Sequence, residues 1–156
     1  MKNKLILGTA NFGKKYGLSN YNLSEKSIHI IFKYLINNSL IYLDTAQEYG
    51  SSENIIGNYD HSNKFKLISK FKLLKDENTR DVIFQSFNKL RTNKIYGLLY
   101  HDFNDIINFP SSLDILKEFK RKSKIDKIGF SLYFPSQLDY LINNQIHFDI
   151  IQIPYN

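Results

Sequence analysis

The stretch that decides the fold is Asp44 to Gly57, which reads Asp-Thr-Ala-Gln-Glu-Tyr-Gly-Ser-Ser-Glu-Asn-Ile-Ile-Gly and follows the apolar run Leu40-Ile41-Tyr42-Leu43. A short, continuous apolar run is typical of a strand that is buried on both faces of a parallel sheet. This strand ends in the carboxylate Asp44, Tyr49 follows five residues later, and Ser51 or Ser52 can cap a short helix. The stretch therefore predicts one βα unit with polar groups where its strand ends.

The same alternation of strand and helix continues along the chain. Ser24 is the predicted N-cap of a helix that ends at Asn37, Thr79 is the predicted N-cap of a later helix, and Pro135 fits the first turn of another. Repeated βα units predict a parallel sheet with right-handed crossovers. The predicted strands cover residues 4–10, 41–46, 65–70, 96–101, 127–132 and 148–153.

This alternation fits both a (β/α)8 barrel and an open, doubly wound sheet. The open sheet would bind a dinucleotide through a Gly-x-Gly-x-x-Gly turn after its first strand. Here that turn is Gly8-Thr9-Ala10-Asn11-Phe12-Gly13, which lacks the middle glycine and disfavours the open sheet. A barrel typically has about 250 residues, whereas this chain has 156 and its last predicted strand is the sixth.

Composition excludes several kinds of function. The chain has no cysteine, which excludes disulfides and thiol catalysis, and it has no paired-histidine metal motif. No apolar run approaches the roughly 20 residues that cross a membrane, and residues 1–4 lead directly into a predicted strand, so we expect a cytoplasmic location. The net charge of +6 would suit a phosphorylated cofactor or nucleic acid, but the scattered lysines favour solvated helix faces.

The strand ends resemble those of the aldo/keto reductase family, in the family's order. Asp44 to Gly57 is the most specific match, and the apolar run that ends at Gly8 resembles the first strand and its glycine-bearing loop. The strands that end in Lys70 and His101 resemble the third and fourth, and those that end in Ser131 and Gln152 resemble the fifth and sixth. The resemblance implies one domain, residues 1–156, that forms an incomplete (β/α)8 TIM barrel of about six βα units and is C-terminally incomplete.

The resemblance also implies a catalytic tetrad of Asp44, Tyr49, Lys70 and His101, because the active site of a barrel lies where its strands end. In carbonyl reduction, a hydride attacks carbon and negative charge develops on oxygen. The resemblance makes Tyr49 the proton donor, with Lys70 favouring release of the phenol proton and Asp44 orienting the lysine. His101 would polarise the oxygen. Taken singly, each residue is more often a cap, a core contact or a surface group than a catalytic residue.

The cofactor implied by the resemblance is NADPH (NADP), and the implied substrate is a small-molecule aldehyde or ketone. Gly8 and Thr9 match the loop beside the nicotinamide ribose, and Ser131 and Gln152 match residues that contact the nicotinamide amide. Leu132 stands where the family often has asparagine, which removes one hydrogen bond. From the residues alone, Ser131 and Gln152 also fit hydrogen-bonding groups that line a barrel.

Three hypotheses about function follow. The first is an NAD(P)H-dependent oxidoreductase that reduces aldehydes or ketones to alcohols. The second is a catalytically inactive, truncated paralogue or fragment that acts through self-association, because six parallel strands leave two open edges. In the family, the residues that grip the adenosine 2′-phosphate follow strands seven and eight, so we expect little reductase activity from the isolated chain. The least favoured is a basic nucleic-acid-binding domain, since no motif interleaves basic and aromatic residues.

Overall fold

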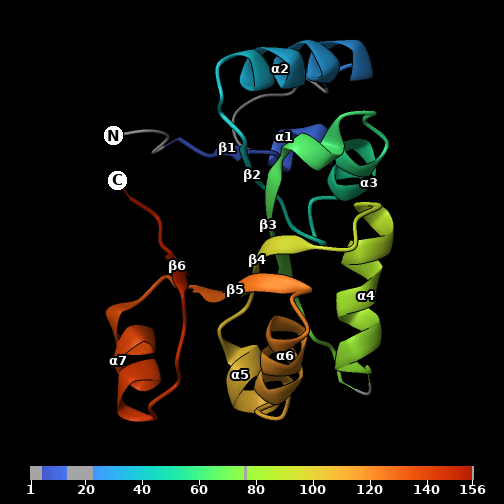
Figure 1. Ribbon diagram of the computed structural model, residues 1–156. Coiled ribbons are helices and arrows are strands. Elements are labelled where there is room, and N and C mark those ends of the chain that lie inside the picture. The colour runs from blue at the N-terminus through green and yellow to red at the C-terminus, as the bar shows by residue number, and fades with distance from the viewer. Residues whose placement is uncertain (1–4, 14–22, 76, 156) are drawn as a thin grey trace.

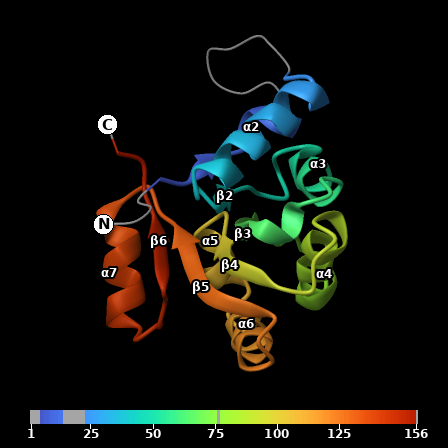
Figure 2. The same cartoon turned by 45° about the horizontal axis from the view of Figure 1, so that its top comes forward.

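The computed structural model describes residues 5–13, 23–75 and 77–155, and the six strands of this part form one parallel sheet in chain order. Figures 1 and 2 show the sheet curling, with the helices arranged around its outer side. This confirms the predicted incomplete (β/α)8 barrel. The strands are β1 (Leu7–Gly8), β2 (Tyr42–Asp44), β3 (Lys66–Phe71), β4 (Ile95–Tyr100), β5 (Ile125–Ser131) and β6 (Ile150–Gln152).

The two outermost strands and the inner strand β2 are shorter than the sequence predicts, with β2 covering three residues of the predicted 41–46. β1 covers two residues of the predicted 4–10, and β6 covers three of the predicted 148–153; Lys4 lies outside the described residues. In the described part of the chain, each outermost strand pairs with a neighbour on one side, β1 with β2 and β6 with β5. An apolar pattern predicts that a strand exists, but its length also depends on how much partner backbone it meets.

The helices begin largely where the sequence predicts. The Ser24 hydroxyl accepts a hydrogen bond from the Ser27 backbone N–H at 3.1 Å, and Pro135 is the first residue of its helix. The prediction of Thr79 as an N-cap is wrong, because Asn78 takes that position and accepts from the Arg80 backbone N–H at 2.9 Å. The helices are α1 (Ala10–Gly13), α2 (Glu25–Asn37), α3 (Ser52–Gly57), the 3-10 turn η1 (Ser62–Lys64), α4 (Thr79–Lys89), α5 (Asn104–Asn108), α6 (Ser112–Arg121) and α7 (Pro135–Asn143). None of the helices in the described ranges has both the length and the apolar character to span a bilayer.

Three aromatic side chains pack against one another at the ends of the central strands β3, β4 and β5. Phe71 of β3 lies 4.7 Å from Tyr100 of β4 between ring centroids, and Tyr100 stacks on Phe130 of β5 at 4.8 Å. Such ring pairs contribute about 0.5–1.5 kcal/mol each beyond their burial. Each ring is next in sequence to a predicted site residue, Lys70, His101 or Ser131. Because successive side chains of a strand point to opposite faces, this anchored aromatic row fixes the strand ends from which the site residues project.

Candidate active site

The parallel register brings the ends of β2 and β3 together. Asp44, the last residue of β2, lies opposite Ile68, so Lys70 is two residues further along β3. The Lys70 ammonium donates to both carboxylate oxygens of Asp44 at 2.8 Å and to the carbonyl oxygen of Thr45 at 2.9 Å. Burial lowers the pKa of Lys70, and the Asp44 carboxylate opposes that shift. The site therefore contains a buried cation, the Lys70 ammonium, which is hydrogen-bonded to both carboxylate oxygens of Asp44.

Tyr49 reaches the same cation from the loop between β2 and α3. Its hydroxyl lies 3.4 Å from the Lys70 ammonium, and the ammonium lies 4.9 Å from the centroid of its ring. The loop turns at Gly50, which has a φ of 62°. Gly13 of α1 packs so closely against this loop that a Cβ there would collide with the Tyr49 carbonyl oxygen and the Ser51 backbone nitrogen. Close packing of α1 therefore sets the position of Tyr49.

His101 closes the cluster from the end of β4. Its backbone N–H donates to the carbonyl oxygen of Phe71 at 2.8 Å, which continues the β3–β4 ladder to the histidine. The imidazole meets the Tyr49 ring edge to face, with 5.8 Å between centroids and an interplanar angle of 87°. The Nδ1 atom of His101 lies 3.2 Å from a carboxylate oxygen of Glu48. The structure thus brings Asp44, Tyr49, Lys70 and His101 together, while their catalytic roles stay a prediction.

A cavity of about 430 Å³ lies inside the curl of the sheet and joins this cluster to two of the four predicted cofactor-binding residues. Gly8, Asp44 and Gln152 all line it, so the ends of β1, β2 and β6 share one space. The rest of the lining is apolar and comes from β1, β3, β4 and β6 and their flanks: Ile6, Ile68, Leu99, Ile150, Ile151 and Ile153. The cavity is of the mostly apolar, few-polar-group kind that binds organic ligands.

Thr9 is placed differently from the other predicted cofactor residues. Its side chain is buried, and its hydroxyl donates to the backbone carbonyl of Asp44 at 3.0 Å. The hydroxyl of Ser52, the first residue of α3, donates in turn to the Thr9 hydroxyl at 2.8 Å. Thr9 therefore braces β1 against β2 and α3.

Ser131 of β5 and Gln152 of β6 lie side by side, as paired positions of the two parallel strands. The side-chain oxygen of Gln152 is buried, and within the described residues it has no hydrogen-bond partner. Buried acceptors are normally paired, and water or a bound ligand can supply the donor; the NH₂ of a nicotinamide carboxamide is a donor of this kind. Leu132 packs into the core and offers no polar group here. The residues present therefore fit a nicotinamide at this end of the sheet.

Two contributors to the site were not predicted from the sequence. The Thr45 carbonyl is a ligand of the Lys70 ammonium, and Glu48 contacts the His101 ring. Both lie inside the stretch that points to the fold. The spacing from Asp44 to Tyr49 predicts a loop, but it does not show where the intervening carbonyls and side chains point.

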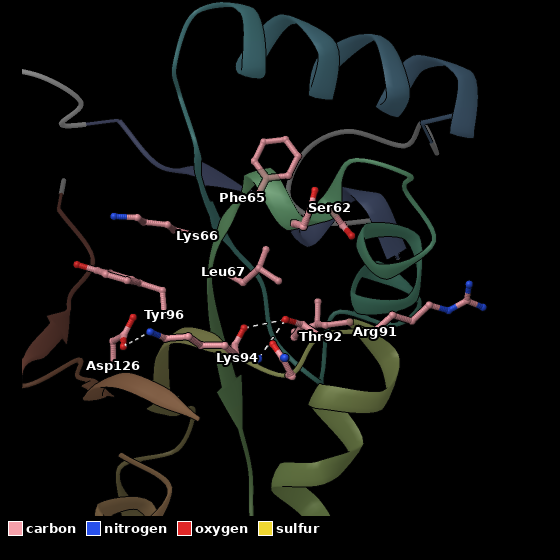
Figure 3. A pocket seen from close by; sticks show the side chains of 12 residues that line it. Ser62, Phe65, Lys66, Leu67, Arg91, Thr92, Lys94, Tyr96 and Asp126 are labelled. Atoms are coloured by element: carbon pink, nitrogen blue, oxygen red, sulfur yellow. Dashed lines mark hydrogen bonds and ion pairs between the residues drawn. The ribbon is translucent and has the colours of Figure 1, made fainter. Parts of the chain in front are cut away.

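Another pocket, of about 330 Å³, lies at the opposite end of the strands (Figure 3). Its lining includes residues at or just after the starts of β3, β4 and β5, such as Lys66, Tyr96 and Asp126. Lys94 and Asp126 form an ion pair there at 2.7 Å. None of the predicted site residues lines it, so the chemistry of the site belongs to the other end of the sheet.

Parallel strands with intervening helices, and a buried lysine–carboxylate pair where the strands end, define a protein of the (β/α) barrel class. The chain belongs to the aldo/keto reductase family, because the model of that family matches residues 4–156. A comparison with curated protein sequences finds no match.

Solved structures share the fold. The crystal structure of PA4992 from Pseudomonas aeruginosa, assigned to the aldo-keto reductases, superposes with a TM-score of 0.80 at 21% identity, covering 97% of this chain and 62% of that chain. Tm1743, a thermostable aldo-keto reductase solved with the inhibitor epalrestat, gives 0.73 at 20% identity, over 97% and 58%. An aldo-keto reductase from Klebsiella pneumoniae in complex with NADPH gives 0.76 at 19% identity, over 96% and 54%. The chain therefore spans less than two thirds of the length of these relatives.

Proposed function

We propose that this site belongs to an NAD(P)H-dependent oxidoreductase that reduces an aldehyde or ketone to an alcohol. Membership of the aldo/keto reductase family supports an oxidoreductase in general terms. The observation that carries the proposal is the position of the Lys70 ammonium, which contacts the Asp44 carboxylate and the Tyr49 hydroxyl at once. A phenol beside a desolvated ammonium is suited to passing a proton to a nearby oxygen.

Each side chain has one part in this reaction. Tyr49 donates a proton to the carbonyl oxygen, and Lys70 favours the phenolate that remains. Asp44 keeps the buried ammonium charged and fixes its direction. His101, which meets the Tyr49 ring at its edge, donates a hydrogen bond to the same oxygen and stabilises its developing charge. Ser131 and Gln152 would hold a nicotinamide, which would supply the hydride to the carbonyl carbon; together with the proton from Tyr49, this would convert the carbonyl into an alcohol.

The proposed cofactor is NADPH, held at its nicotinamide end by Gln152 and Ser131. The unpartnered, buried oxygen of Gln152 supports this, since it lies on the cavity that Asp44 also lines. The Klebsiella pneumoniae structure, whose fold this chain shares, is in complex with NADPH, which is consistent with the same cofactor here. The apolar part of the cavity suits the carbon skeleton of a small carbonyl substrate.

The test combines a fluorescence titration of NADPH with steady-state NADPH oxidation by a reactive aldehyde, with the barrel completed either by self-association at high protein concentration or by fusion to two further βα units. We expect Tyr49→Phe to bind NADPH as the parent chain does and to lose at least about 10²-fold in turnover, the usual contribution of general acid catalysis. Tyr34→Phe, on an exposed ring of α2, is the matched control and should behave as the parent. Turnover that survives Tyr49→Phe would remove the proton-donor assignment. A parent chain that binds no NADPH would favour the inactive alternative.

A further inference from the structure

Glu48 holds an unusual place at the rim of the cluster. It directly precedes Tyr49 in the loop after β2, yet its carboxylate turns toward the end of β4 and lies 3.2 Å from Nδ1 of His101. The imidazole is 17% exposed and the carboxylate 47% exposed. The loop that carries the predicted proton donor therefore also carries a negative charge that contacts the histidine.

Other charged groups lie around the Glu48–His101 contact. On the β4 side, Asp102 follows His101 in sequence, and Lys72, just past β3, lies 3.8 Å from the Asp102 carboxylate and 4.0 Å from that of Glu48. On the other side the ring meets Tyr49, beyond which lies the Lys70–Asp44 pair. Lys72 therefore offsets part of the charge of Glu48 without separating it from the imidazole.

The contact with Glu48 affects which nitrogens of the His101 imidazole carry a proton. A neutral imidazole donates from one nitrogen and accepts at the other, whereas a carboxylate can accept but cannot donate. The 3.2 Å contact with the Glu48 carboxylate therefore favours a proton on Nδ1 of His101. To donate also to a substrate oxygen the ring must carry a second proton on Nε2, and a carboxylate at contact distance favours that doubly protonated form.

We propose that Glu48 is a positioning residue that holds the Nδ1–H of His101 and favours the doubly protonated ring, so that Nε2 donates to the substrate oxygen. The catalytic part of this proposal rests on the proposed function, while the pairing of Glu48 with His101 does not. Because Glu48 is half exposed, its influence is moderate and weakens as salt screens the pair.

The first experiment follows the imidazole itself by NMR titration, with no need for turnover. The chain has four histidines, and a His101→Gln variant identifies the resonance of interest. We expect Glu48→Gln to lower the titration midpoint of His101 by about 0.5–1 pH unit, and Glu48→Asp to restore part of the loss. Asp102→Asn is the matched control, because it removes a neighbouring charge that pairs with Lys72, and it should move the midpoint less.

The second experiment measures turnover against pH for the parent chain and for Glu48→Gln, with the barrel completed as in the test of the proposed function. If doubly protonated His101 is the active form, the rate falls as pH rises through its midpoint, and Glu48→Gln moves that fall to lower pH by the shift seen in the NMR titration. An unchanged midpoint in Glu48→Gln, or an equal shift in Asp102→Asn, would overturn the pairing. An NMR shift with no matching change in the pH profile would refute the catalytic part and leave the pairing standing.

Discussion

The ammonium of Lys70 and the carboxylate of Asp44 form a bidentate contact, with both oxygens 2.8 Å from the nitrogen, at a place where the lysine is 2% exposed. Moving an ammonium out of water costs several kcal/mol, and a carboxylate with good geometry offsets most of this cost. The contact therefore has a structural role, the retention of a buried cation, in addition to the catalytic role that we propose for it.

Asp44→Asn should destabilise the fold strongly. The variant leaves the Lys70 ammonium buried without a charged partner, and breaking such a pair from one side costs about 3 kcal/mol or more. Urea unfolding measures the change in the free energy of unfolding. Adding Lys70→Met to Asp44→Asn should recover part of the loss, because it removes the unpaired charge. A double variant less stable than Asp44→Asn would show that the lysine contributes mainly through its packing.

Stability should fall as pH rises above 4.5 because of Glu53. This residue of α3 is buried and accepts a hydrogen bond from the Ser69 hydroxyl at 2.7 Å, and burial raises the pKa of its carboxyl above the ordinary 4.5. Between 4.5 and the raised pKa, the folded state holds a proton that the unfolded state has released. The free energy of unfolding therefore decreases as pH rises through this window.

Glu53→Gln tests this because it removes the titration and keeps an oxygen for Ser69. Urea unfolding at a series of pH values should give a curve that is flatter above pH 4.5 than that of the parent. Glu25→Gln, an exposed carboxylate at the start of α2, is the control and should keep the slope of the parent curve. An identical slope in Glu53→Gln and the parent would mean that other groups cause the dependence.

Gly13→Ala should disturb the loop that positions Tyr49. A Cβ at Gly13 would collide with backbone atoms of Tyr49, Ser51 and Ser52, so the loop or α1 must shift. Forcing extra volume into close packing costs about 1–3 kcal/mol. Urea unfolding measures this cost, and Gly8→Ala is its control, because a Cβ at Gly8 meets no atom within 4 Å. Equal effects of the two substitutions would show that the close approach at Gly13 is relieved without cost.

The strand-end positions of Lys70 and His101 could be predicted from the sequence for a simple reason. Each ends a buried apolar run, and parallel strands all end on the same side of a sheet. The side chain of Glu48 could not be predicted in this way, because the direction of a loop residue depends on the packing of α1 against the loop at Gly13. The N-cap of α4 was misplaced because Asn78 and Thr79 are adjacent and both residue types can cap a helix.

The limits of the edge strands also depend on tertiary context. The runs around Ile6 and Ile151 are apolar enough for longer strands, but each meets partner backbone on one side within the described residues. Similarly, the unpartnered side-chain oxygen of Gln152 could not be predicted from the sequence. It is recognised only in the folded structure, where Gln152 pairs with Ser131 of β5. The hydrophobic pattern of a sequence identifies its strands and helices. Buried polar atoms without a hydrogen-bond partner can be identified only after these strands and helices have packed together.

The outer edges of β1 and β6, which have no partner strand within the described residues, should cause this chain to self-associate. Ile6, beside β1, and Ile153, beside β6, are 50% and 60% exposed and line the same cavity. Apolar side chains next to unpaired strand edges favour pairing with a second copy. We expect light scattering to show a mass that rises with concentration, and Ile153→Lys to reduce that rise by placing a charge at the β6 edge. Ile142→Lys, at an equally exposed isoleucine on α7 (60%), is the matched control and should leave the association unchanged. A parent chain that stays monomeric at high concentration, or an equal effect of both lysine variants, would refute association through this edge.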